Sequence, residues 1–166
     1  MLGLFISQSA SAQYKKGDKL LNLGIGLNSY YSGGIPLSAS FEYGITEDIS
    51  IGGMLDYLNY NYGYVGYSYS FSALYFGGRG SYHFNRLLNL RDQNWDLYGG
   101  ASLGYRSFSW SDNTFNGTGL GNAYGSGVFL GIHAGAKYYF SPKFGVFGEL
   151  GALGSSNIRV GVAFKF

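Results

Sequence analysis

Apolar side chains alternate with polar or small ones along about eight segments of this chain, from Lys19 to the last residue. The final segment shows the pattern most clearly: Ile158, Val160, Val162, Phe164 and Phe166 alternate with Arg159, Gly161, Ala163 and Lys165. Successive side chains of a β-strand point to opposite faces, so a period of two indicates strands with one apolar and one polar face. No segment keeps a helical period, which predicts an all-β fold of eight strands.

Such alternation fits either a soluble barrel with its apolar face inside or a membrane barrel with its apolar face outside. The polar faces here are rich in Gly, Ala and Ser, and a narrow eight-stranded interior needs small residues. Charged residues make up 12% of the chain, against about 25% in soluble domains. The sequence therefore favours an eight-stranded antiparallel up-and-down transmembrane β-barrel, closed so that no strand edge meets lipid.

Charged residues within the strands fall on the small-residue face. On a lipid-facing surface each cation would cost roughly 2–4 kcal/mol at mid-membrane, whereas opposite charges can pair inside the barrel. We therefore predict a lumen charge network made of Glu42, Asp56, Arg79, Arg106, Lys137, Glu149 and Arg159.

Connections between the segments alternate in length. Residues 46–48, 85–94 and 141–143 form short or charged turns, which would share one rim. Residues 29–34, 61–69 and 111–126 read as longer loops on the opposite rim, and a slip of phase at Phe108 and Trp110 predicts a bulge there. Aromatic residues collect near both rims, as interfacial girdles require. They are Tyr43, Phe84, Trp95, Phe140, Phe144 and Phe166 at the short-turn rim, and Tyr57, Tyr60, Tyr62, Tyr64, Tyr67 and Tyr69 at the other.

The amino-terminal residues have the character of an export signal. Residues 2–6 are apolar, and Ala10-Ser11-Ala12 has the small-x-small form of a signal-peptidase site. We interpret residues 1–13 as a signal-peptide remnant and residues 14–166 as one barrel domain. The chain has no cysteine, and its net charge of +2 comes from dispersed basic residues, which argues against a nucleic-acid partner.

The cleavage-like Ala10-Ser11-Ala12, the eight alternating segments and the ending Ala163-Phe164-Lys165-Phe166 resemble the small outer-membrane barrels of the OmpX/OmpW and OmpA-barrel type in Gram-negative bacteria. The resemblance implies an outer-membrane location, with outer-membrane lipid and the outer-membrane assembly machinery as partners. It also implies that Phe166, with Phe164 contributing, is the signal by which that machinery recognises the chain.

Architecture of this kind supports several functions. The leading hypothesis is a structural or surface-interaction role, with an external ligand bound at the outward loops, where the tyrosine-rich residues 57–69 lie. The alternatives are a narrow passage for small solutes, a lipid-modifying enzyme and a soluble ligand-binding barrel. The only imidazoles, His83 and His133, are predicted to point inward, away from an outer-leaflet lipid. We therefore predict no catalytic residue, no cofactor and no metal site.

Overall fold

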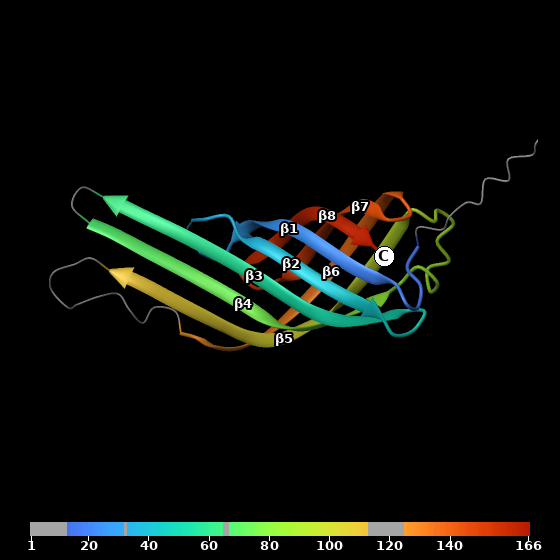
Figure 1. Ribbon diagram of the computed structural model, residues 1–166, viewed down its shortest axis with the longest axis horizontal. Coiled ribbons are helices and arrows are strands. Elements are labelled where there is room, and N and C mark those ends of the chain that lie inside the picture. Colours follow the sequence, from blue (N-terminus) through green and yellow to red (C-terminus); the bar gives the residue numbers. More distant parts are fainter. Residues whose placement is uncertain (1–12, 32, 65–66, 113–124) are drawn as a thin grey trace, which may run out of the picture.

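The computed structural model describes residues 13–31, 33–64, 67–112 and 125–166, which form a closed antiparallel barrel. Each strand pairs with its sequence neighbours, and β1 closes the barrel by pairing with β8 (Figure 1). The strands are β1 Lys19–Ser29, β2 Leu37–Gly44, β3 Ile49–Tyr64, β4 Tyr67–His83, β5 Trp95–Asp112, β6 Gly127–Ser141, β7 Phe144–Ala152 and β8 Ser156–Lys165. The predicted eight-stranded up-and-down fold is confirmed. Among the described residues, no helix has the length and hydropathy needed to cross a bilayer.

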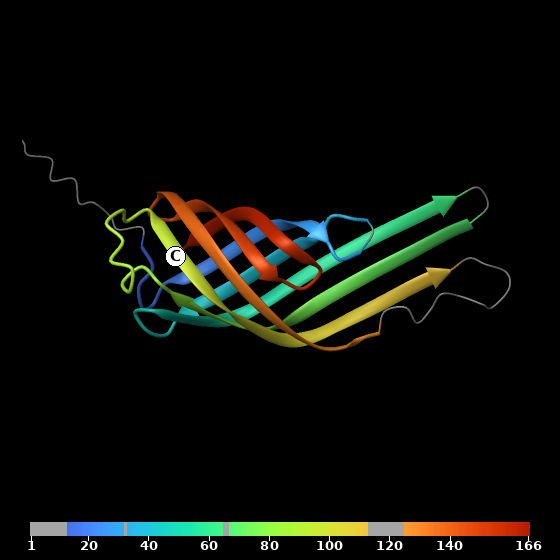
Figure 2. The same cartoon turned by 180° about the vertical axis from the view of Figure 1, so that it is seen from behind.

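The strands differ in length, which gives the barrel an uneven outer end. β3, β4 and β5 have 16, 17 and 18 residues, whereas β7 and β8 have 9 and 10. Figure 1 and Figure 2 show the three long strands projecting well beyond the rest of the wall, at the end opposite to the carboxyl terminus. The short turns predicted for residues 46–48, 85–94 and 141–143 all join strands at the carboxyl-terminal end. We call these the long-strand end and the short-turn end.

Two predictions about the long-strand end are wrong. The tyrosine-rich residues 61–69 are not a loop: β3 continues to Tyr64, and its partner β4 begins at Tyr67. Alternating aromatic and polar residues suit a paired strand as well as a loop, and cross-strand pairing decides between them. The bulge is also absent, because Phe108 and Trp110 pair in unbroken register with Ala73 and Phe71. Residues 113–124 of the predicted loop 111–126 lie outside the described residues, as do residues 1–12 of the predicted export signal.

The exposed fractions of the side chains show which face of each strand points outward. Along β6, Val128, Leu130 and Ile132 are 73%, 72% and 62% exposed, while Phe129 and His133 between and beside them are buried. Large apolar residues thus cover the outside, while the inside holds the charged and most of the polar strand residues together with buried aromatic side chains such as Phe129 and Tyr98. This polarity is the one predicted for a transmembrane barrel and the reverse of a soluble ligand-binding barrel.

Phe147 is the exception on the small-residue face of β7, and the structure supplies the reason. Its ring points into the lumen and is buried. A Cβ atom on Gly24 or on Gly161 would lie 2.8 Å from that ring. Glycine at these two positions of β1 and β8 therefore makes the room that Phe147 occupies.

Aromatic side chains form a band at the short-turn end, where the rings of β5, β6, β7 and β8 contact one another in sequence. Trp95 and Tyr138 lie 5.0 Å apart between ring centroids, and Phe144 and Phe164 lie 5.4 Å apart. The predicted members Tyr43, Trp95, Phe140, Phe144 and Phe166 are all exposed. At the other end Tyr57 is exposed, but Tyr60 packs against buried residues of the interior. The side chains of residues 62–69 lie outside the described part of the structure.

Candidate functional site

A network of ion pairs crosses the middle of the lumen, and Arg79 of β4 lies at its centre. Its Nε donates to Glu42 Oε1 of β2 at 2.8 Å. Its two terminal nitrogens donate to the two carboxylate oxygens of Glu149 of β7, with Nη1 to Oε2 at 3.2 Å. All three side chains are at most 2% exposed. Because β2, β4 and β7 are not neighbours in the wall, these bonds span the interior.

Arg159 of β8 continues the network to β3. Its Nη1 lies 3.3 Å from Glu149 Oε2, and its Nη2 lies 2.7 Å from Asp56 Oδ2. Ser155 donates to the other oxygen of Asp56 at 2.7 Å. Five of the seven predicted network residues are thus brought together: Glu42, Asp56, Arg79, Glu149 and Arg159. Because each buried charge has a partner of opposite sign, the low-polarity interior can hold all of them.

Lys137 of β6 lies in a separate cluster nearer the short-turn end. Its Nζ is 3.7 Å from Asp96 Oδ2 and 4.3 Å above the ring of Tyr98, a cation–π arrangement. The Tyr98 hydroxyl donates to Glu149 at 2.9 Å and so links this cluster to the central network. Asp96 and Tyr98 were not among the predicted site residues. Both have even numbers, like Arg106, and therefore lie on the same inward face of β5. This shared parity was the feature of the sequence that could have identified them as lumen residues.

Arg106 of β5 does not join the network. It pairs through its backbone with Tyr75, four residues before Arg79 on β4, and this separation is about 13 Å along the strand. Its guanidinium carbon lies 5.7 Å from the centroid of the Phe108 ring. Arg106 makes no ion pair within the described part of the structure, and its buried Nε has no hydrogen-bond acceptor there.

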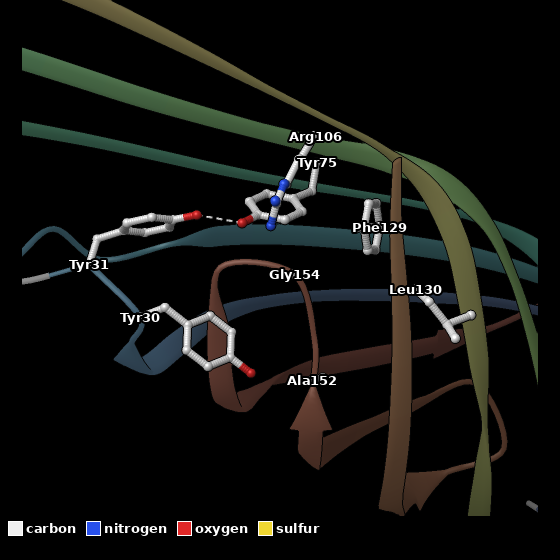
Figure 3. Close-up of a pocket in the computed structure, with 8 residues that line it drawn as sticks. All are labelled: Tyr30, Tyr31, Tyr75, Arg106, Phe129, Leu130, Ala152 and Gly154. Atoms are coloured by element: carbon white, nitrogen blue, oxygen red, sulfur yellow. Dashed lines mark hydrogen bonds between the residues drawn. The ribbon is translucent and has the colours of Figure 1, made fainter. Parts of the chain in front are cut away.

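Aromatic residues line the lumen around Arg106. The hydroxyls of Tyr31 and Tyr75 are 2.5 Å apart, and the Tyr75 ring meets Phe129 edge to face with centroids 5.2 Å apart. Phe71 and Phe108 stack beside them. Figure 3 shows Arg106, Tyr75 and Tyr31 on one side of a pocket and Tyr30, Ala152 and Gly154 across from them. Partial burial, with a contribution from Tyr75, raises the pKa of the Tyr30 hydroxyl above its ordinary value.

The short-turn end of the lumen is filled by residues that precede β1. The ring of Tyr14 stacks on His83 with centroids 3.5 Å apart and planes 5° apart. Its hydroxyl donates to the carbonyl oxygens of Ile49 and Thr46, at 2.5 and 2.9 Å. Lys165 Nζ holds the same segment by donating to Gln13 O at 3.0 Å. Nothing in the alternation predicted this plug, because residues 13–18 carry no strand pattern of their own.

His83 has two hydrogen-bonding neighbours that resemble a catalytic triad. Its Nε2 lies 3.0 Å from Ser50 Oγ, and its Nδ1 lies 2.7 Å from Asp96 Oδ1. Ser50 also donates to Glu42, and it is fully buried beneath the layer that Tyr14 covers. A nucleophile must reach its substrate and have its proton accepted by the base. This serine does neither, so the arrangement fits a structural role.

His133, the second predicted imidazole, also points inward. Its Nε2 lies 3.0 Å from Ser81 Oγ. In the described part of the chain, no group of three or more His, Cys, Asp or Glu side chains could hold a metal ion. Both histidines thus lie inside the lumen, with His83 1% and His133 6% exposed, as the alternation predicts.

Comparison with solved structures agrees with this geometry. OprG of Pseudomonas aeruginosa matches with a TM-score of 0.63 and 15% identity, over 93% of this chain and 98% of OprG. The fold is that of the small outer-membrane β-barrels. The attachment invasion locus protein Ail of Yersinia pestis matches with a TM-score of 0.53 and 14% identity, over 91% of this chain and 99% of Ail. Neisserial surface protein A matches with a TM-score of 0.52 and 18% identity, over 90% of this chain and 95% of that protein.

No protein-family model matches the chain, and no curated protein sequence matches it. At these identities the outer-membrane barrels share the architecture of this chain rather than a set of functional residues.

Proposed function

We propose that this chain is an integral outer-membrane barrel with a plugged interior, which acts as a scaffold and presents its long strands to partners outside the cell. The observation that carries the proposal is the central ion-pair network. Arg79, Glu42 and Glu149 bridge the lumen from non-adjacent strands and exclude solvent from their side chains. Tyr14 fills the short-turn end as well.

The outer surface supports the membrane location. Exposed apolar side chains such as Leu103 and Leu150 cover the strands, and aromatic residues ring the short-turn end. A water-soluble protein would rarely expose so continuous an apolar surface. The long-strand end faces outward in this proposal, because short turns lie on the periplasmic side of such barrels.

A cysteine-labelling experiment tests the orientation, and the absence of native cysteine makes it clean. Asn61 on β3 and Leu88 in the β4–β5 connection are both exposed, at opposite ends of the barrel. In intact cells a membrane-impermeant maleimide should label the Asn61→Cys variant, and should label Leu88→Cys only after the outer membrane is permeabilised. Equal labelling of both variants in intact cells would contradict the proposed orientation.

The passage alternative needs a continuous aqueous path, which the network opposes. In planar bilayers the purified protein should therefore give no steady conductance, in a membrane where an open porin conducts. A stable single-channel current, abolished on removal of the protein, would replace the scaffold proposal by the passage alternative.

The terminal strand supports an assembly role for its last aromatic residues. Phe166 is 64% exposed on the outside of the barrel, and its backbone exchanges hydrogen bonds with Lys19 of β1 at 2.9 and 3.1 Å. Phe164 packs against Phe144 of β7. Because most of the Phe166 side chain is exposed on the outer surface, we propose that it serves recognition by the assembly machinery, with Phe164 contributing.

A further inference from the structure

We propose that the mouth of the barrel holds a binding site for a small aromatic carboxylate, whose anionic group pairs with Arg106. The site is a pocket of about 320 Å³ at the long-strand end of the lumen (Figure 3). Its walls include Tyr30, Tyr31, Tyr75 and Phe129. This proposal adds a ligand to the proposed surface role. It rests on that role in one respect, namely that the long-strand end of the barrel faces the outside of the cell.

None of the nine acidic side chains of the chain is placed to form an ion pair with Arg106. Of the nine, six are in ion pairs with other cations: Asp18, Glu42, Asp48, Asp56, Asp96 and Glu149. Glu47 and Asp92 belong to turns at the opposite end of the barrel. Asp112 lies six residues further along β5, about 20 Å away. The segments outside the described residues contain no Asp or Glu.

The geometry of Arg106 suits a carboxylate. The Nε atom of Arg106 is buried and lacks a hydrogen-bond acceptor among the described residues. In a guanidinium group, Nε and one Nη form a planar fork of two hydrogen-bond donors. A carboxylate can accept both hydrogen bonds of that fork at once. Arg106 is half-buried, and a cation withdrawn from water without such a partner is costly, so an anion supplied from outside would relieve part of that cost.

The charge of the pocket limits the anion further. Among the described residues that line it, Arg106 is the only charged side chain; Tyr30, Tyr31 and Tyr75 contribute neutral hydroxyls and the remaining lining is apolar. Asp56 lies behind Gly154, where its oxygen is 3.0 Å from the position that a Cβ atom would take, and Arg159 already pairs with it. Because the Asp56 carboxylate is already neutralised by Arg159, the single positive charge of Arg106 suits a monoanion better than a phosphate dianion.

The walls favour a ring over an alkyl chain. Tyr75 and Phe129 meet at 77°, so each presents an edge or a face into the space between them and Arg106. Aromatic rings stack or meet edge to face with such partners and gain about 0.5–1.5 kcal/mol beyond the burial of area. Tyr30, 48% exposed on the far side, offers a hydroxyl to a polar ring substituent.

The pocket is reached over the lowest part of the wall. β7 ends at Ala152, where it pairs with Ile132, so β6 residues before Ile132 have no partner on β7. Ala152 and Gly154 of the short β7–β8 hairpin form the floor of the opening. Figure 2 shows this hairpin ending well before β3, β4 and β5. Among the described residues, this part of the wall gives a small solute a route to the pocket that does not cross the central network.

Calorimetric titration of the folded protein in uncharged micelles tests the proposal, with 4-hydroxybenzoate as the probe. We expect saturable binding that the neutral isostere 4-hydroxybenzamide does not show. The Arg106→Gln variant should weaken binding by about ten- to hundredfold, the usual worth of hydrogen bonds to a charged group. Arg106→Lys keeps the charge without the fork and should fall between the two.

Arg86→Gln is the matched control, because Arg86 is an exposed arginine at the opposite end of the barrel, and it should leave the affinity unchanged. The Arg106 Nε–H resonance of the wild-type protein should also shift on titration, a readout that requires no variant to fold. Three results would overturn the proposal: no saturable binding of 4-hydroxybenzoate, equal binding by Arg106→Gln, or equal binding of octanoate or inorganic phosphate. None of them bears on conductance or cysteine labelling, so the scaffold proposal is judged separately.

Discussion

Arg79 on β4 forms a two-pronged ion pair with Glu149 on β7, a residue 70 positions later in the chain and across the lumen. The same guanidinium also holds Glu42, and Glu149 also holds Arg159. One buried arginine therefore joins carboxylates from two other strands. The pairing explains why the interior tolerates charge, and it supports the proposed plugged lumen.

Removal of that arginine should destabilise the barrel strongly. In Arg79→Met the carboxylates of Glu42 and Glu149 stay buried after losing their shared cation, which typically costs about 3–5 kcal/mol. Urea unfolding in micelles, followed by the difference in gel mobility between folded and boiled protein, measures the change. Arg86→Met breaks an exposed pair with Asp48 and should cost less than about 1 kcal/mol. Similar losses in the two variants would show that the network contributes little.

A charge placed on the outer surface should report the lipid around it. Leu103 on β5 is 60% exposed at the level of the central network, since its neighbour Ser102 pairs with Arg79. Leu103→Arg should cost roughly 2–4 kcal/mol of unfolding free energy in bilayers. Leu88→Arg, in the β4–β5 connection, should cost much less, because that position lies outside the strands. Equal costs for both arginines would argue that water surrounds Leu103.

Docking of the amino-terminal plug should weaken in strong alkali. Burial raises the pKa of the Tyr14 hydroxyl, and Asp18 adds to the effect. A raised pKa in the folded state means that the contribution to stability is complete below the ordinary tyrosine pKa of about 10, and is lost as the pH rises above it. The difference in unfolding free energy between wild type and Tyr14→Phe should therefore shrink between pH 9 and pH 12. A constant difference over that range would contradict the assignment.

Loss of the last aromatic residue should slow assembly without destabilising the finished barrel. Phe166→Ala should insert more slowly in the presence of the outer-membrane assembly machinery, while its urea midpoint stays close to that of the wild type. Phe140→Ala provides the control, because Phe140 is 63% exposed in the same aromatic band but lies on β6 rather than on the last strand. Equal insertion rates for the two variants would remove the proposed signal role from Phe166.

Side-chain parity explains how much of this barrel could be predicted from the sequence. Alternation fixes which face each residue occupies, so the inward positions of His83, His133 and the charged residues followed directly. Parity carries no information about height along the barrel axis, which depends on the register between strands. Arg79 and Arg106 share a face, yet register separates them by four residues on β4. The sequence could therefore predict that both arginines face the lumen. It could not predict that Arg106 lies too far along the barrel axis to join the ion-pair network.

Two other features lay beyond the pattern for physical reasons. Tyr14 contacts His83 because residues 13–18 pack into the short-turn end of the lumen. This segment is irregular, so it has no periodic pattern from which its position could be predicted. The extension of β3 and β4 into the tyrosine-rich segment depends on pairs such as Tyr60 with Phe71, which exist only once both strands are aligned. Long-range pairing, rather than local preference, determined these outcomes.

Fluorescence quenching by brominated lipid tests the central claim most directly, namely that the apolar face of the alternation meets lipid. In a background with Trp95→Phe and Trp110→Phe, a single tryptophan is introduced as Leu103→Trp or as Leu88→Trp. The account predicts strong quenching by lipids brominated along their acyl chains for Leu103→Trp, and weak quenching for Leu88→Trp. Leu103→Trp fluorescence that acyl-chain bromines leave unchanged, in a protein that stays folded without lipid or detergent, would contradict it.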